Sequence, residues 1–259
     1  MPGGCNIGLE GARVLVTAST RGIGFGIARA IAECGGTPTI NGRSPGSVER
    51  ALETLRSLGL NAYGVPADLA VRGEASRLVR EAASLMGGLD GLVYVPPPPP
   101  SGGFREVSLD DWRLSYRLLI EAAVEAVREA INIMGRGSIV FVTSIAAIRP
   151  MHGIVTSSVL RPGLHVLTRM LARELGPRGI RVNAVAPGLI MTDRLRALAE
   201  ERARAKGTST ASELESMAGS IPLGRLGTPR DIGSIVVFLL STLSEYVSGA
   251  VIPVAGGMY

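Results

Sequence analysis

The 259-residue sequence predicts a single α/β domain, a doubly wound parallel seven-stranded sheet with helices on both faces. Two observations carry this prediction. Short apolar segments alternate along the whole chain with longer amphipathic ones, which is typical of strand–helix–strand units. The first apolar segment, residues 14–16, runs through a turn of small residues directly into a helix. At 27.0 kDa the chain can bury one large core, and no internal repeat marks a second domain.

The turn after the first strand has the composition of an anion site. Gly22 and Gly24 allow a close approach of the backbone, and the helix they open ends at Gly35 and Gly36. Unpaired N–H groups and the positive end of the helix dipole converge at such a turn, where a pyrophosphate can bind. An ordinary strand–helix turn is the alternative; the position near the N-terminus favours a dinucleotide site. The apolar face of the helix comprises Ile23, Ile27, Ala30, Ile31 and Cys34.

The other elements follow in alternation. We expect further strands at residues 37–40, 61–66, 91–95, 138–143 and 181–185, and a last one leading into 253–257. We expect helices at 47–58, 78–86, 109–134 and 159–175, two charged helices within 193–218, and one ending at 240. The 109–134 helix has an apolar stripe of Trp112, Tyr116, Leu119, Ala123 and Val127.

Composition limits the function classes. The net charge is +5 and the pI 9.7, but the arginines are spread among acidic residues, so we expect no nucleic-acid partner. No apolar run of eighteen residues occurs and the first ten residues do not form a signal peptide, so we expect a cytoplasmic protein without a membrane partner. Cys5 and Cys34 are too few for a disulfide framework, and the two histidines lack partners at metal-ligand spacing.

The amino-acid usage also bears on thermal stability. Lys206 is the only lysine and the chain has no glutamine, whereas arginine is abundant. Few amide side chains, many arginines and short loops are typical of thermophile proteins. A codon-usage bias is the alternative explanation.

Several motifs resemble those of the short-chain dehydrogenases/reductases. Thr17-Ala-Ser-Thr-Arg-Gly-Ile-Gly24 is similar to the family's Thr-Gly-x-x-x-Gly-x-Gly, with Ala18 in place of the first glycine. That methyl group costs little if the backbone keeps φ negative at Ala18. Residues 187–192 match Pro-Gly-x-x-x-Thr, and residues 221–232 are again close to the family. The resemblance implies one NAD(P)-binding Rossmann domain over residues 1–259, a substrate lid at about 193–220, and a homodimer or homotetramer.

The cofactor prediction depends on the end of the second strand, Asn41-Gly-Arg43. Dinucleotide folds place an acidic residue here for the ribose 2′-hydroxyl. Gly42 stands at that position, and Arg43 with Arg21 can bind a 2′-phosphate, so the sequence favours NADP over NAD. Together with the resemblance, which adds the adenine contacts and the Pro-Gly-x-x-x-Thr motif, the predicted cofactor residues are Thr17, Ser19, Thr20, Arg21, Gly22, Ile23, Gly24, Asn41, Arg43, Asp68, Leu69, Arg161, Pro187, Gly188, Ile190 and Thr192.

The catalytic positions depart from the family. A Ser, a Tyr thirteen residues later and a Lys after four more correspond to Ser144, Ser157 and Arg161, and the helical Asn corresponds to Leu119. A serine hydroxyl is a much weaker acid than a phenol, and arginine does not release its proton. The loop residue His152 is a substitute acid/base candidate. The resemblance is thus to a divergent 3-oxoacyl-reductase-like branch with Ser-x-x-x-Arg.

The loop after the fourth predicted strand is a second departure. Five prolines, residues 96–100, follow Tyr94 and Val95 where the family has Asn-Asn-Ala-Gly. Proline fixes an extended backbone and offers no N–H donor, so we expect a stiff loop that closes one wall of the site.

The leading hypothesis is an NADP(H)-dependent oxidoreductase that transfers hydride between nicotinamide and a ketone or secondary alcohol, such as a 3-oxoacyl thioester or a sugar. Ser144 holds the carbonyl, and Ser157 with water, or His152, transfers the proton. The altered catalytic positions favour a different class, a dinucleotide-binding protein without turnover that acts as a sensor or assembly partner. A basic nucleic-acid binder on the same fold is a third, weaker hypothesis.

Overall fold

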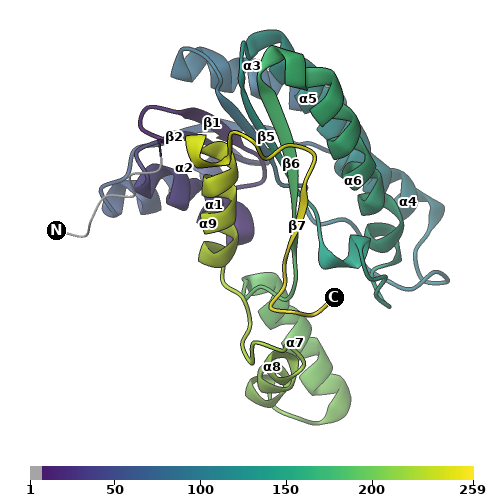
Figure 1. Ribbon diagram of the computed structural model, residues 1–259. Helices are drawn as coiled ribbons and strands as arrows, with labels where there is room; N and C mark the ends of the chain where they lie inside the picture. The colour runs from purple at the N-terminus through teal and green to yellow at the C-terminus, as the bar shows by residue number, and fades with distance from the viewer. Residues whose placement is uncertain (1–7) are drawn as a thin grey trace.

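The computed structural model describes residues 8–259; Cys5 and the first seven residues, where part of the signal-peptide prediction falls, lie outside the described range. As predicted, seven parallel strands form one sheet, and their order in it is β3-β2-β1-β4-β5-β6-β7 (Figure 1). The chain builds outward from β1 to β3, then returns to place β4 against the other side of β1, which creates a switch point between them. The strands are β1 (Arg13–Val16), β2 (Thr37–Gly42), β3 (Tyr63–Pro66), β4 (Gly91–Tyr94), β5 (Gly137–Val142), β6 (Ile180–Pro187) and β7 (Val251–Val254).

Helices cover both faces of the sheet because successive strand side chains point to opposite sides. Leu15 joins the apolar core of one face, and its neighbours Val14 and Val16 join the core of the other. The first core is covered by α3 (Glu74–Met86), α5 (Ala122–Ile133) and α6 (Val155–Leu175). The second is covered by α1 (Gly22–Glu33), α2 (Pro45–Ser57) and α9 (Pro229–Leu240). Figure 1 shows these two helical layers on either side of the strands.

The predicted helix at 109–134 is interrupted. It consists of α4 (Leu109–Tyr116), a π-helical turn at Arg117–Glu121, and α5. The wider π turn displaces the apolar stripe, so Leu119 is fully buried while Tyr116 keeps 51% of its surface exposed. A single straight stripe was therefore a wrong expectation, since the 3.6-residue period does not continue through the π turn.

Helix α6 begins four residues earlier than expected, so Ser157 lies in its first turn. Leu164 is fully buried against the sheet and Leu167 packs on the same core. From the sequence, the pattern of Leu164 and Leu167, with Trp112 and Tyr116, predicts apolar helix faces larger than one sheet face can cover; Leu164 and Leu167 instead pack on the sheet, so that prediction is wrong for these two residues. The exposed apolar side chains of α6 are Val159, Val166 and Met170.

Two helices extend beyond the carboxyl ends of the strands, α7 (Asp193–Lys206) and α8 (Thr210–Gly219) (Figure 1). They form a small core of Leu195, Ala199 and Met217. Lys206 donates to the buried Glu213 carboxylate at 2.9 Å, which joins the two helices. Within residues 8–259, no helix has both the length and the apolar character needed to cross a membrane.

Candidate active site

The turn between β1 and α1 lies at the carboxyl edge, beside the switch point. Ala18 has φ +44°, in the left-handed region, so the expected negative φ is wrong and the methyl group is strained. Gly22 also has a positive φ of 58°. A Cβ atom on Gly24 would stand 2.5 Å from the Ala18 carbonyl oxygen, so only glycine fits there. The turn is therefore folded tightly under the start of α1.

Three predicted cofactor residues support this turn through buried hydrogen bonds. The Thr17 hydroxyl donates to the Val95 carbonyl and accepts the Val95 N–H, both at 2.8 Å. The Ser19 hydroxyl donates to the Val16 carbonyl and accepts the Asn41 N–H. The Asn41 amide accepts the Ala18 N–H and donates to carbonyls at the end of β3. These side chains hold the turn in place and leave its backbone to face a ligand.

The start of α1 is suited to anions. No side chain caps this helix, and its first turn contains no acidic residue. Arg21 and Arg43 are exposed and form no ion pair with any residue in the range 8–259. A Cβ atom on Gly42 would stand 2.6 Å from the Thr20 methyl carbon, so an acidic side chain at 42 does not fit the present packing. The predicted ribose end thus presents two cations and no carboxylate at position 42.

Asp68 and Leu69, the two residues expected to contact the adenine, lie in different environments. Leu69 is 1% exposed and belongs to the sheet core, so its side chain faces inward. Asp68 lies half-buried just beyond β3, and its carboxylate accepts the Ala70 N–H at 3.0 Å. Asp68 is therefore the polar group that this loop offers.

The motif at 187–192 meets the glycine turn. Gly188 packs so closely on Ala255 that a Cβ atom would stand 2.8 Å from the Ala255 Cβ. Ile190 is buried, and Thr192 caps α7 by accepting the Leu195 N–H. The Thr192 methyl carbon lies 3.5 Å from the position of a Cβ on Gly22. The structure therefore brings together two motifs separated by about 170 residues in sequence.

The three predicted catalytic residues converge where β5 ends. Ser144 follows β5 and its hydroxyl accepts the Ala146 N–H at 3.1 Å. Ser157 and Arg161 are one turn apart on α6 and share a face. Arg161 donates to the Thr143 carbonyl at 2.8 Å and more weakly to that of Val142 at 3.3 Å. The Ser157 hydroxyl is without a hydrogen-bond partner among the described residues.

Arg161 is a buried cation in an unusual setting. Its side chain lies among apolar and carbonyl groups, and its Nε has no hydrogen-bond partner in the part of the chain the structure describes. Burial and the nearby charge of Arg194 lower the pKa of Arg161 to about 10. Arg161 therefore stays charged at neutral pH and supplies positive potential to the site without acting as a proton donor.

The proline loop, residues 96–100, is bonded to the segment that leads into α6. The Pro100 carbonyl accepts the Thr156 hydroxyl at 3.1 Å, next to Ser157. The Gly102 N–H donates to the Gly153 carbonyl at 2.7 Å. These bonds fix the loop against the start of α6. The alternative proton carrier His152 precedes Gly153 and is exposed at this junction.

Three side chains near the site were missed from the sequence. Tyr94 is fully buried, donates to the Leu118 carbonyl at 2.7 Å, and has a pKa raised by that burial. His165 bonds the Thr143 hydroxyl at 2.9 Å, and burial lowers its pKa. Arg194 donates to the Ser101 hydroxyl at 2.8 Å. Arg194 had a usable signal, since it stands two residues after Thr192; the other two depend on three-dimensional packing.

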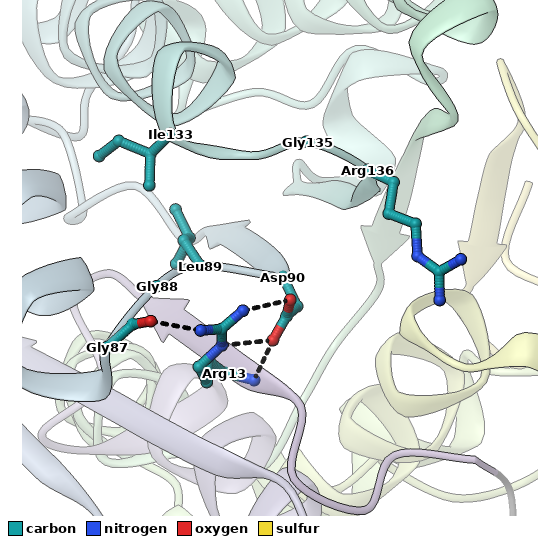
Figure 2. A pocket seen from close by; sticks show the side chains of 8 residues that line it. All are labelled: Arg13, Gly87, Gly88, Leu89, Asp90, Ile133, Gly135 and Arg136. Carbon is teal, nitrogen blue, oxygen red and sulfur yellow. Dashed lines mark hydrogen bonds and ion pairs between the residues drawn. The ribbon is translucent and has the colours of Figure 1, made fainter.

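A cavity also lies away from these residues, at the amino ends of the strands (Figure 2). It measures about 520 Å³ and its floor is the pair of Arg13 and Asp90, joined by two side-chain hydrogen bonds of 2.8 and 2.9 Å. Arg13 also donates to the Gly87 carbonyl, and Arg136 projects away from this pair (Figure 2). The Arg13 and Asp90 side chains, which are 34% and 41% exposed, thus bond to each other at the floor of this depression. Residues 8–259 contain no cluster of three metal-ligating side chains.

A family model and several curated proteins match this chain over almost its whole length. A family model described as enoyl-(acyl carrier protein) reductase matches residues 17–259. Human dehydrogenase/reductase SDR family member 4 is 37% identical over 247 residues, which cover 94% of this chain and 86% of the relative. The 3-oxoacyl-[acyl-carrier-protein] reductase FabG of Aquifex aeolicus is 34% identical over 257 residues, covering 98% and 99%.

A solved structure extends the comparison to three dimensions. The L-sorbose reductase of Gluconobacter frateurii, in complex with NADPH and L-sorbose, superposes with a TM-score of 0.92 at 28% identity. The superposition covers 98% of each chain. Almost the whole chain, with helices α7 and α8, thus has a counterpart in that reductase.

Proposed function

Because this chain belongs to the short-chain dehydrogenases/reductases, we propose that it is an NADP(H)-dependent oxidoreductase acting on a ketone or secondary alcohol. The observation that carries the proposal is the meeting of the glycine turn with the 187–192 motif beside an uncapped helix start. Such a turn accepts a pyrophosphate through backbone N–H groups. A bound nicotinamide supplies or accepts the hydride.

NADP is favoured over NAD by the charges at the ribose end. Arg43 and Arg21 are exposed cations without ion pairs to described residues, and Gly42 leaves no carboxylate to repel a 2′-phosphate. Guanidinium groups bind phosphate through charge-assisted hydrogen bonds. NAD remains the alternative cofactor, to be measured in the same titration.

The chain's own residues support carbonyl chemistry in a modified form. The hydroxyl groups of Ser144 and Ser157 bind the substrate oxygen, and the buried charge of Arg161 stabilises negative charge that develops on it. Ser157 passes a proton to or from this oxygen through water, with His152 as the alternative carrier. Helices α7 and α8 act as a substrate lid at about 193–220, and the proline loop excludes water from the opposite wall.

A two-stage experiment tests the proposal. Fluorescence titration with NADPH and NADH at fixed salt measures cofactor binding, and a panel of 3-oxoacyl thioesters, sugars and simple ketones then measures product formation. We expect tighter binding of NADPH and turnover of at least one carbonyl. The absence of binding by either cofactor contradicts the proposal.

A second candidate is favoured by the substitutions at Leu119, Ser157 and Arg161. Leucine carries no exchangeable proton, arginine does not release its proton, and a serine hydroxyl is a much weaker acid than the family's phenol. A dinucleotide-binding protein without turnover, acting as a sensor or assembly partner, fits the same cofactor site. Normal NADPH binding with no product from any carbonyl or alcohol supports this candidate over the enzyme.

We also propose assembly into a homodimer or homotetramer. Helices α4 and α6 expose Tyr116, Val159, Val166 and Met170, and Met170 keeps 63% of its surface accessible. Apolar side chains at this density on neighbouring helices are typical of an interface. Light scattering at micromolar concentration tests this, and a monomeric mass contradicts it.

A further inference from the structure

Arg161 is a buried cation without an anionic partner among residues 8–259. Only 9% of its surface is exposed, its Nη1 donates to two backbone carbonyls, and its Nε is enclosed without a partner among the described residues. No acidic side chain in the described range forms an ion pair with it. A buried charge is normally compensated by an opposite charge, because carbonyl dipoles satisfy only part of its solvation. Within the described residues, the charge of Arg161 is therefore left for a ligand to neutralise.

A second guanidinium approaches the same place. Arg194, in the first turn of α7, donates through Nη2 to the Ser101 hydroxyl at 2.8 Å. The preceding carbonyl, that of Pro100, accepts the hydroxyl of Thr156, the residue before Ser157. This sequence of contacts brings the lid arginine to the wall of the site that holds Arg161. Arg194 likewise forms no ion pair with a described residue, and its Nε and Nη1 form no hydrogen bond there.

Building on the proposed function, we propose that Arg161 and Arg194 bind a carboxylate of the substrate, so that the enzyme prefers oxo acids or hydroxy acids. Two guanidinium groups with spare N–H donors suit the paired oxygens of a carboxylate. Ribose hydroxyl groups can accept from Arg161 but carry no charge to neutralise it. The pyrophosphate belongs at the start of α1, which has its own N–H groups. The carboxylate then lies next to the carbonyl that Ser144 and Ser157 hold.

Calorimetry on the NADP-loaded protein tests the proposal without requiring turnover. The probes are pyruvate, acetoacetate and levulinate, each paired with its methyl ester, which keeps the carbonyl and removes the charge. We expect at least one acid to bind about tenfold or more tightly than its ester, the gain expected from one charge-assisted pair. Arg194→Gln should abolish this preference. Arg196→Gln is the matched control, because Arg196 is an exposed arginine of the same helix without a side-chain bond to any described residue.

The outcomes separate the two proposals. Esters that bind as tightly as their acids, or an acid preference that Arg194→Gln and Arg196→Gln leave equally intact, overturn the carboxylate site. Inorganic phosphate that binds in an Arg194-dependent way, with no oxo acid doing so, identifies a phosphate site and also overturns it. Failure to load NADP overturns the proposed function instead. Arg194-dependent binding of an oxo acid that is never reduced supports the carboxylate site and contradicts the enzyme.

Discussion

The two sides of the carboxyl edge are built differently. On the cofactor side, Thr17, Ser19 and Asn41 are buried and each forms side-chain hydrogen bonds within the chain. On the substrate side, the Ser157 hydroxyl and the Arg161 Nε have no partner among the described residues. On the proposed cofactor side, these three buried side chains are paired, and the exposed Arg21 and Arg43 with the N–H groups at the start of α1 are left for a ligand. On the proposed substrate side, the unpaired polar groups belong to the buried side chains themselves.

This difference shows which changes each side tolerates. The cofactor side depends on close approach and on backbone shape, so its residue types are nearly fixed by packing. The substrate side depends on charge and hydroxyl groups that face a ligand, and its residues follow the chemistry of that ligand. The departures from the family at Ser157, Arg161 and residues 96–100 all lie on the substrate side.

The largest expected effect is on turnover. Ser157→Ala removes the unpaired hydroxyl, and we expect turnover to fall about a hundredfold, the usual contribution of a general acid/base. The NADPH dissociation constant should stay nearly unchanged, because Ser157 lies on the substrate side. Steady-state kinetics and fluorescence titration measure the two quantities. If turnover is unaffected, the proton carrier lies elsewhere and His152→Ala is the next variant.

A structural substitution tests the cofactor side. Asn41→Ala leaves the Ala18 N–H and two carbonyls near the end of β3 without their partner. Buried unpaired groups destabilise by about 1–3 kcal/mol, so we expect a loss of about 2 kcal/mol in denaturant unfolding, with weaker NADPH binding. Asn61→Ala removes an exposed asparagine and should change neither. Equal unfolding free energies and equal NADPH affinities of the two variants would contradict this role of the Asn41 side chain.

The preference for NADPH over NADH tests the proposed role of Arg43 on the cofactor side. Arg43→Asp exchanges an exposed cation for a carboxylate at the proposed 2′-phosphate site. We expect the preference for NADPH to reverse, with NADPH affinity reduced about tenfold by loss of a charge-assisted bond. Titration of both cofactors at one salt concentration measures this. Equal affinities for NADPH and NADH in the unmodified protein contradict the assignment.

Unfolding at low pH tests the effect of the buried His165 on stability. Burial lowers the pKa of His165 below its usual value, so the unfolded chain binds the proton more readily than the folded one. Its stability contribution is complete above about pH 6.5 and declines as the pH falls toward the lowered value, by at most about 1.4 kcal/mol per pH unit. Urea unfolding at several pH values measures the decline. His165→Asn should reduce the slope, and an unchanged slope would contradict the lowered pKa of His165.

The smallest expected effect is at Ala18. Glycine removes the methyl group from a left-handed backbone and should raise the unfolding free energy by about 1 kcal/mol. Thermal unfolding with and without NADPH measures the gain. A fall in stability contradicts the strain at this position.

Much of the fold follows from the sequence because each strand is a short apolar segment bounded by glycine, proline or small polar residues. The glycine turn and residues 187–192 were also recognisable, since close packing restricts their residue types. The π turn at Arg117–Glu121 and the left-handed φ of Ala18 were not, because no single residue there signals either. The lack of an acidic partner for Arg161 among the described residues could not be predicted either, because it depends on all the elements that pack around this side chain.

We propose that this chain turns over a carbonyl substrate despite the substitutions at Ser157 and Arg161. The most direct measurement is the consumption of NADPH by the unmodified protein across a panel of neutral and anionic ketones, followed by the absorbance of the reduced nicotinamide. We expect the protein to consume many equivalents of NADPH per chain with at least one ketone. Binding of NADPH without consumption beyond the buffer control for any ketone contradicts it.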